Sequence, residues 1–287
     1  MRKPLFTLLA LLSLGAAAAP VSLVQNEYDF VAAVAKHGTR DGFLMYLDEQ
    51  AITLDPMPVN DYQAHQKAKP SAAKLSWYPT WALVSSAGDF GIDTGPWTYE
   101  AMRKGRTERA YGEWLTVWTR DQAGAWKISF DSGIDHVLMR TPPQPLAHDA
   151  SVEQLPVTGG RQPAAEDMWS ELRHADMAFS DDAVAKGLRA AYDKSGSDDL
   201  RLLLEDHLPV LGKAAALDAT PATPTLQRVA VGGSVAHSGD LGYIYGLDYA
   251  LDDVKRQTAV GSYMHVWRKS ADGWKLLIAM DAPFPAK

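Results

Sequence analysis

The chain of 287 residues contains no cysteine, so no disulfide bond can stabilise it. Its stability must come from apolar cores, and a hydrophobic content of 46% is sufficient to build them. Motifs of common active sites are missing too: the eight histidines form no H-E-x-x-H or H-x-x-x-H pattern, and neither G-x-S-x-G nor a phosphate-binding glycine loop occurs. We therefore expect no metal site and no cofactor.

Positive charge is also in short supply. Lysine and arginine together number 28 against 35 aspartates and glutamates, which gives a formal net charge of −7. An excess of acidic side chains disfavours binding to nucleic acid and to anionic membrane surfaces, because both partners are themselves negative. We expect neither kind of partner.

Residues 1–19 are typical of a secretion signal. Arg2 and Lys3 supply a positive start, an apolar stretch runs from Leu5 to Leu14, and small residues follow from Ala16 to Ala19. This apolar stretch is too short to remain as a stable membrane anchor. We expect the segment to be cleaved, the mature chain to be soluble and not inserted in a membrane, and the protein to be periplasmic or secreted.

The remainder of the chain contains an internal repeat. SSAGDFGIDTGPWTYE (85–100) is matched by AHSGDLGYIYGLDYAL (236–251), and LTVWTRDQAGAWK (115–127) by MHVWRKSADGWK (264–275). Trp118 lies 149 positions before Trp267, and Trp126 lies 148 positions before Trp274. A nearly constant offset over separated blocks indicates a tandem duplication.

Each copy combines helical and strand patterns in the same order. Apolar residues with helical spacing come first, at 23–47 and 168–192, and aromatic and β-branched stretches joined by short glycine-containing turns follow. The pattern predicts an α+β fold with helices packed on an antiparallel sheet. We expect domains at 20–140 and 167–287, joined by a linker at 141–166 that is rich in proline and glycine.

The helix pairs, SGDLGYIYG and VWRKSADGWKLL resemble the DUF4440 (SnoaL-like) branch of the NTF2-like, ketosteroid-isomerase-like superfamily. The resemblance implies two tandem cone-shaped domains, each with N-terminal helices on a strongly curved antiparallel sheet and a pocket at one end. It also implies pairing through the sheets, either as an internal pseudo-dimer or as a homodimer. The superfamily includes isomerases and dehydratases as well as non-catalytic binding modules, so the fold alone does not determine the function.

Candidate catalytic residues are few. Asp131 and Asp281 end strands beside apolar residues, and His265 shares one strand face with Tyr263 and Trp267. A pocket histidine or aspartate would suit acid–base chemistry of the isomerase or dehydratase kind. The alternative is that His265 is a satisfied framework histidine and that the aromatic residues beside it only pack.

Aromatic residues at strand and helix positions are the candidates for a ligand pocket. Tyr243 and Tyr245 alternate onto one face, where they either line a pocket or form the surface on which the copies pack. The other pocket candidates are Tyr46, Trp81, Trp97, Trp114, Thr116, Tyr192, Tyr263 and His265.

Three functions are compatible with these features. The first is binding of a small apolar molecule in one or both cones, without catalysis. The second is an isomerase or dehydratase that uses a pocket histidine or aspartate. The third is a structural or protein-interaction module whose cones are filled with side chains.

Overall fold

A computed structural model describes residues 22–157, 164–220, 226–251 and 258–285. The expected signal segment 1–19 lies outside these ranges. The described residues form six helices and fourteen strands in an α+β arrangement with two separate sheets, which confirms the α+β part of the predicted fold class. Within the described ranges, no helix combines the length and the apolar character that crossing a bilayer requires.

The N-terminal half, residues 22–157, contains three helices and a sheet of strand order β2-β1-β7-β6-β5-β4-β8, to which β3 adds by pairing with β5. The helices are α1 Leu23–His37, α2 Thr39–Tyr46 and α3 Asp61–Lys67. The strands are β1 Leu47–Asp55, β2 Met57–Asn60, β3 Lys74–Trp77, β4 Trp81–Val84, β5 Phe90–Arg103, β6 Arg106–Arg120, β7 Trp126–Asp135 and β8 Glu153–Gln154.

The C-terminal half, residues 164–285, has the sheet order β10-β9-β14-β13-β12-β11. The helices are α4 Ala165–Lys186, α5 Leu188–Ser195 and α6 Lys213–Ala219. The strands are β9 Gly196–Leu204, β10 Val210–Leu211, β11 Leu226–Val235, β12 Leu241–Ala250, β13 Ala259–Ser270 and β14 Gly273–Pro283. In both halves the strand after the second helix joins the second strand of the last long hairpin in parallel, β1 with β7 and β9 with β14, while the long hairpins are antiparallel.

Glycines at matching positions turn the chain between the first two helices of each half. Gly38 ends α1 with φ 83°, and Gly187 ends α4 with φ 89°. Positive φ is accessible to glycine at little cost, so each glycine stops one helix and starts the next at an angle. The first two helices therefore form a bent pair in both halves.

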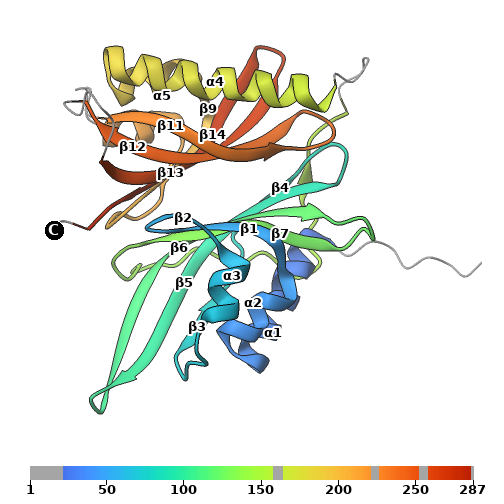
Figure 1. Cartoon of the computed structure of the whole chain (residues 1–287), viewed down its shortest axis with the longest axis vertical. Coiled ribbons are helices and arrows are strands. Elements are labelled where there is room, and N and C mark those ends of the chain that lie inside the picture. The colour runs from blue at the N-terminus through green and yellow to red at the C-terminus, as the bar shows by residue number, and fades with distance from the viewer. Residues whose placement is uncertain (1–21, 158–163, 221–225, 252–257, 286–287) are drawn as a thin grey trace, which may run out of the picture.

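The two sheets face each other, and the helices cover their outer faces (Figure 1). A core between the sheets joins both halves: Phe90, Val117 and Phe130 come from one, and Met264 and Val266 from the other. The expected linker also contributes, because β8 pairs with β4 and Leu155 packs into this core. The two halves therefore form one continuous unit.

Contacts between the halves are reciprocal. The Ser86 amide donates to Asp240 Oδ2 at 3.0 Å, and the His237 amide donates to Asp89 Oδ2 at 3.0 Å. Ser86 and His237 are 151 positions apart, as are Asp89 and Asp240. Such an exchange, in which each copy makes the same contact to the other, is the pattern of a two-fold interface.

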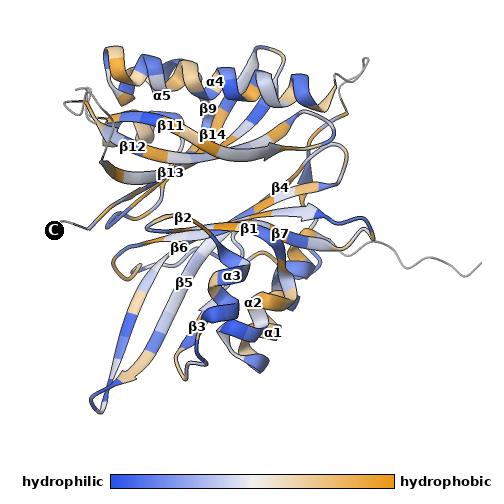
Figure 2. Ribbon diagram, viewed as in Figure 1, coloured by the Kyte–Doolittle hydropathy of each residue, from blue (hydrophilic) through white to orange (hydrophobic). Residues whose placement is uncertain are grey.

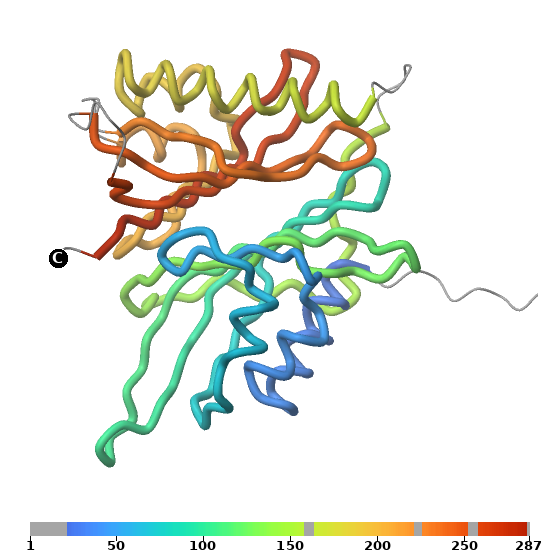
Figure 3. Tube along the Cα trace, viewed as in Figure 1, coloured from blue at the N-terminus to red at the C-terminus, as the bar shows by residue number. Residues whose placement is uncertain are grey.

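The β5–β6 hairpin extends well beyond the rest of the N-terminal half (Figures 1 and 3). Lys104 and Gly105 make its turn with φ of 49° and 77°, which suits a tight two-residue hairpin. The tip is hydrophilic (Figure 2). The inner part of this hairpin forms one wall of the cavity described next.

Candidate functional site

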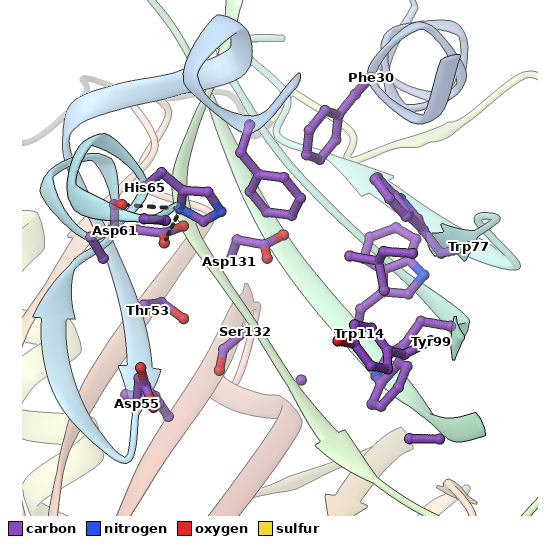
Figure 4. A pocket seen from close by; sticks show the side chains of 18 residues that line it. Phe30, Thr53, Asp55, Asp61, His65, Trp77, Tyr99, Trp114, Asp131 and Ser132 are labelled. Carbon is purple, nitrogen blue, oxygen red and sulfur yellow. Dashed lines mark hydrogen bonds and ion pairs between the residues drawn. The ribbon is translucent and has the colours of Figure 1, made fainter. Parts of the chain in front are cut away.

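A cavity of about 610 Å³ opens in the N-terminal half, between its three helices and the concave side of its sheet (Figure 4). Its volume falls within the usual range for small-molecule sites, roughly 300–1,000 Å³. Every lining residue comes from α1–α3, the residue after α3, or strands β1, β3, β5, β6 and β7. They are Phe30, Phe43, Thr53, Leu54, Asp55, Asp61, Ala64, His65, Ala68, Leu75, Trp77, Trp97, Tyr99, Ala110, Trp114, Asp131, Ser132 and Gly133.

Aromatic rings form much of the cavity wall. Phe30 lies edge-on to Trp77, with ring centroids 5.0 Å apart, and Trp97 and Trp114 come from the neighbouring strands β5 and β6. Trp97 fits only because glycine lies opposite it: a Cβ at Gly112 would come within 2.3 Å of the indole ring. A broad apolar surface of this kind suits a ligand that is itself largely apolar.

Asp131 on β7 is the acidic group nearest the centre of this wall (Figure 4). Its side chain is part-buried and opens onto the cavity, and the Thr116 hydroxyl donates to its Oδ2 at 2.5 Å. Burial, and next the charge of Asp61, raise the pKa of Asp131 to about 8. At neutral pH the side chain is therefore mostly a neutral carboxylic acid, which can donate a hydrogen bond into the cavity.

Asp61 and His65 form a second polar group, one turn apart on α3. His65 Nδ1 lies 3.0 Å from Asp61 Oδ1, and its ring stacks on Phe43 with centroids 4.5 Å apart. Burial acts to lower the pKa of His65, but the hydrogen bond and charge of Asp61 outweigh it, so the net shift is upward. Because Nδ1 faces Asp61, Nε2 is left on the other edge of the ring, toward the cavity (Figure 4).

Two further carboxyl groups lie buried near this wall. Glu27 Oε1 accepts from the Trp77 indole at 2.5 Å, and Asp93 Oδ1 accepts from the Trp118 indole at 3.0 Å. Burial raises the pKa of Glu27 to about 7. Burial, and next the charge of Glu27, raise the pKa of Asp93 well above its usual range. Neither lines the cavity, so their evident role is to hold the two indoles in place.

The C-terminal half has a charge cluster in the corresponding place. Arg228 on β11 reaches Asp281 at 2.5 Å and Asp248 at 3.3 Å, and its Nη1 lies 3.3 Å from His265 Nε2. Burial acts to lower the pKa of Arg228, but Asp281 and then Asp248 raise it well above its usual value. Its guanidinium therefore stays charged in the interior.

Asp176 on α4 holds the other side of this cluster. It accepts from the Tyr263 hydroxyl at 3.0 Å and the Trp267 indole at 3.1 Å, and its Oδ1 lies 2.6 Å from His265 Nδ1. Burial lowers the pKa of His265, although Asp176 opposes the shift, so the imidazole is neutral at pH 7. Each polar atom named here has a partner, so among the described residues this cluster occupies the place that corresponds to the N-terminal cavity.

The sequence-predicted residues are divided between these two interiors and the surface between the sheets. Trp97, Trp114 and Asp131 line the cavity, and Thr116 holds Asp131. His265, Tyr263 and Asp281 belong to the Arg228 cluster instead.

The remaining predicted pocket residues pack elsewhere. Tyr46 packs on Phe30 and Trp118, and Tyr192 is buried against Phe179. The sheet-to-sheet core contains the others: Trp81, under the guanidinium of Arg201, and Tyr243 and Tyr245, against Phe130. For Tyr243 and Tyr245, this position corresponds to the second predicted alternative, the surface on which the two copies pack.

Asp61, His65 and Arg228 were not among the predicted site residues. The i, i+4 spacing in DYQAH (61–65) places an aspartate and a histidine on one helix face and could have indicated the pair. No local signal marks Arg228, since its carboxylate partners lie 20 and 53 residues away. In the described parts of the chain, no three His, Asp or Glu side chains converge as a metal site would require.

Comparison with known proteins gives structural neighbours only, since no family model and no curated protein matches the chain. A ketosteroid isomerase-like protein from Erwinia carotovora is 14% identical, with a TM-score of 0.32, over 41% of this chain and 96% of its own. An NTF2-like protein of unknown function from Pseudomonas putida is 16% identical, with a TM-score of 0.33, over 41% and 88%. A CaMKII hub from S. rosetta is 16% identical, with a TM-score of 0.32, over 41% and 99%.

Each of these neighbours aligns with about two fifths of this chain, and two of them are described as ketosteroid isomerase-like or NTF2-like. The DUF4440 branch itself stays a prediction.

Proposed function

We propose that the protein binds a small, largely apolar molecule in the N-terminal cavity, and that the C-terminal half is a scaffold. The observation that carries the proposal is the contrast between two related interiors: one is a cavity of about 610 Å³ walled by aromatic rings, and the other is filled by Arg228 and its partners. The proposal includes a tandem pair of NTF2-like cones of the DUF4440 branch. It also places the protein in the periplasm or outside the cell, on the strength of residues 1–19.

A pair of matched variants tests the binding site. Ala110 on β6 lines the cavity, and Ala259, 149 positions later, begins β13 in the half that lacks an aromatic cavity among its described residues. Ala110→Phe should fill the cavity and abolish binding, whereas Ala259→Phe should leave it intact. Binding is read as the thermal shift given by a panel of small aromatic compounds. Equal shifts for both variants would overturn the assignment of the site.

A second candidate function is acid–base catalysis in the same cavity. Asp131, held neutral at pH 7, could act as a proton donor, and His65 oriented by Asp61 could act as a base. In the C-terminal half, His265 and Asp281 are engaged by Arg228 and Asp176, which makes them weaker candidates. If a turnover is found, Asp131→Asn and His65→Gln should each remove most of it while His265→Gln should not; equal loss in all three would refute this assignment.

A further inference from the structure

We propose that the ligand of the N-terminal cavity carries a cationic nitrogen on an apolar frame, as a protonated amine does, and that Asp131 and Asp61 receive the charge. The inference rests on the proposed binding function, which it makes more specific. It is drawn from how the C-terminal half fills its own interior.

That interior encloses a cation. The guanidinium of Arg228 lies between the carboxylates of Asp248 and Asp281 and is 5.4 Å from the ring centre of Tyr263 and 5.8 Å from that of Phe179. Carboxylates on one side and aromatic faces on the other are the usual surroundings of a bound organic cation. The arginine side chain thus occupies this half as a ligand would.

Strand register relates the two interiors. Gly91 on β5 pairs with Trp118 on β6, and Gly242 on β12 pairs with Trp267 on β13. Counting along the strands from these two equivalent pairs shows which residues of the two interiors correspond. The walls of the Arg228 site all have counterparts that line the N-terminal cavity. The corresponding pairs are Phe179 with Phe30, Tyr263 with Trp114, Asp248 with Trp97, Asp281 with Gly133, and Arg228 itself with Trp77.

The N-terminal cavity keeps the aromatic walls of this site, but Trp97 and Gly133 stand where Asp248 and Asp281 hold Arg228. Its carboxyl groups come from other positions. Trp77 replaces the arginine, and its indole turns to Glu27 instead of a carboxylate of the cavity. Among the described residues that line the cavity, none is a lysine or an arginine, whereas Asp55, Asp61 and Asp131 all contribute carboxyl groups. The one basic side chain in this lining, His65, is already paired with Asp61. A positive group from outside would supply a charge for the remaining carboxyl groups.

The protonation state of Asp131 gives this idea a distinct signature. A bound cation favours the ionised carboxyl, so binding has to displace the proton that Asp131 holds at neutral pH. Asp61 and His65 on α3, Glu27 on α1 and Asp93 on β5 are the ionisable groups whose charges interact with that of Asp131. Protonation of His65 or Glu27 would also weaken cation binding, so affinity should rise with pH. A neutral or anionic hydrogen-bond acceptor would show the opposite trend or none.

Calorimetric titration with three probes on one frame tests the inference. The probes are 2-phenylethylamine as cation, 2-phenylethanol as neutral analogue and 3-phenylpropanoate as anion. We expect the amine to bind most tightly, with an affinity at least about tenfold higher at pH 8 than at pH 6, because the amine stays protonated while Asp131 ionises. The alcohol should bind weakly at both pH values, and the anion more weakly still.

Variants separate this inference from the proposed function. Asp131→Asn should bring the amine down toward the affinity of the alcohol and reduce the pH dependence to what His65 and Glu27 contribute, while Asp198→Asn, which removes an exposed charge from the other half, should change neither. If the alcohol binds as tightly as the amine and Ala110→Phe abolishes both, the cavity is a ligand site but the cation is wrong. If no probe binds, or if Asp131→Asn leaves amine binding unchanged, the inference also fails.

Discussion

Replacing Asp131 by asparagine should stabilise the protein, and by more at pH 7.5 than at pH 5. The amide has nearly the shape of the neutral acid and can still accept the hydrogen bond from Thr116. Unlike the carboxylic acid, the amide never ionises. The variant therefore removes one titration from the folded protein and leaves the packing almost unchanged.

The sign and size of the effect follow from the pKa values. Asp131 has a pKa of about 8 in the fold against 3.8 for an unperturbed aspartate, so between these values the folded protein holds a proton that the unfolded chain has lost. The free energy of unfolding then falls by up to about 1.4 kcal/mol per pH unit as pH rises. From pH 5 to pH 7.5 the loss is about 3 kcal/mol at most, and roughly half of that if water in the cavity solvates the carboxylate.

Urea unfolding at pH 5, 6, 7 and 7.5 measures this directly. The wild type should lose stability over the series, because Glu27 and Asp93 titrate in the same sense. Asp131→Asn should lose about 1.5–3 kcal/mol less than the wild type over the same series. Asp198→Asn serves as control and should follow the wild type. Parallel curves for Asp131→Asn and the wild type would refute the raised pKa and the burial that causes it.

Two predictions concern packing and the filled interior. Arg228→Met should lower the free energy of unfolding in urea by about 3–5 kcal/mol, because it leaves Asp248 and Asp281 buried without their cation. A loss below about 1 kcal/mol would show that water reaches the cluster. Gly112→Ala should lower the free energy of unfolding by about 1–3 kcal/mol, because the new Cβ would lie 2.0 Å from the Ile134 carbonyl oxygen and would overlap the Trp97 indole. An unchanged melting temperature would contradict the close fit of that indole.

Much of the fold could be predicted because its signals are local. The hairpins are marked by glycine-containing turns between aromatic strands, and the helix pairs by apolar spacing and by Gly38 and Gly187. Strand alternation also separated the faces of β13: Tyr263 and His265 face the helices, while Met264 and Val266 face the other sheet. These patterns depend only on neighbouring residues.

The site could not be predicted in the same way, because it depends on long-range register. The prediction that Asp131 and Asp281 end their strands is wrong, because β7 continues to Asp135 and β14 to Pro283. Asp131 lies opposite Thr116, whereas Asp281 lies opposite Tyr263, two residues further along the strand. Asp131 thus corresponds to Ala279, and the two carboxyl groups have different surroundings. The two interiors differ at Trp77 and Arg228, at Trp97 and Asp248, and at Gly133 and Asp281. No local pattern in these strands marks the difference.

A crystal structure of the protein with 2-phenylethylamine at saturating concentration would test the central claim most directly. The account predicts the amine in the N-terminal cavity, with its nitrogen within hydrogen-bonding distance of Asp131 or Asp61 and its ring against Trp114 or Phe30. The C-terminal interior should be unchanged, with Arg228 still paired. A ligand bound in the C-terminal half or between the sheets, or an empty cavity at that concentration, would contradict the account.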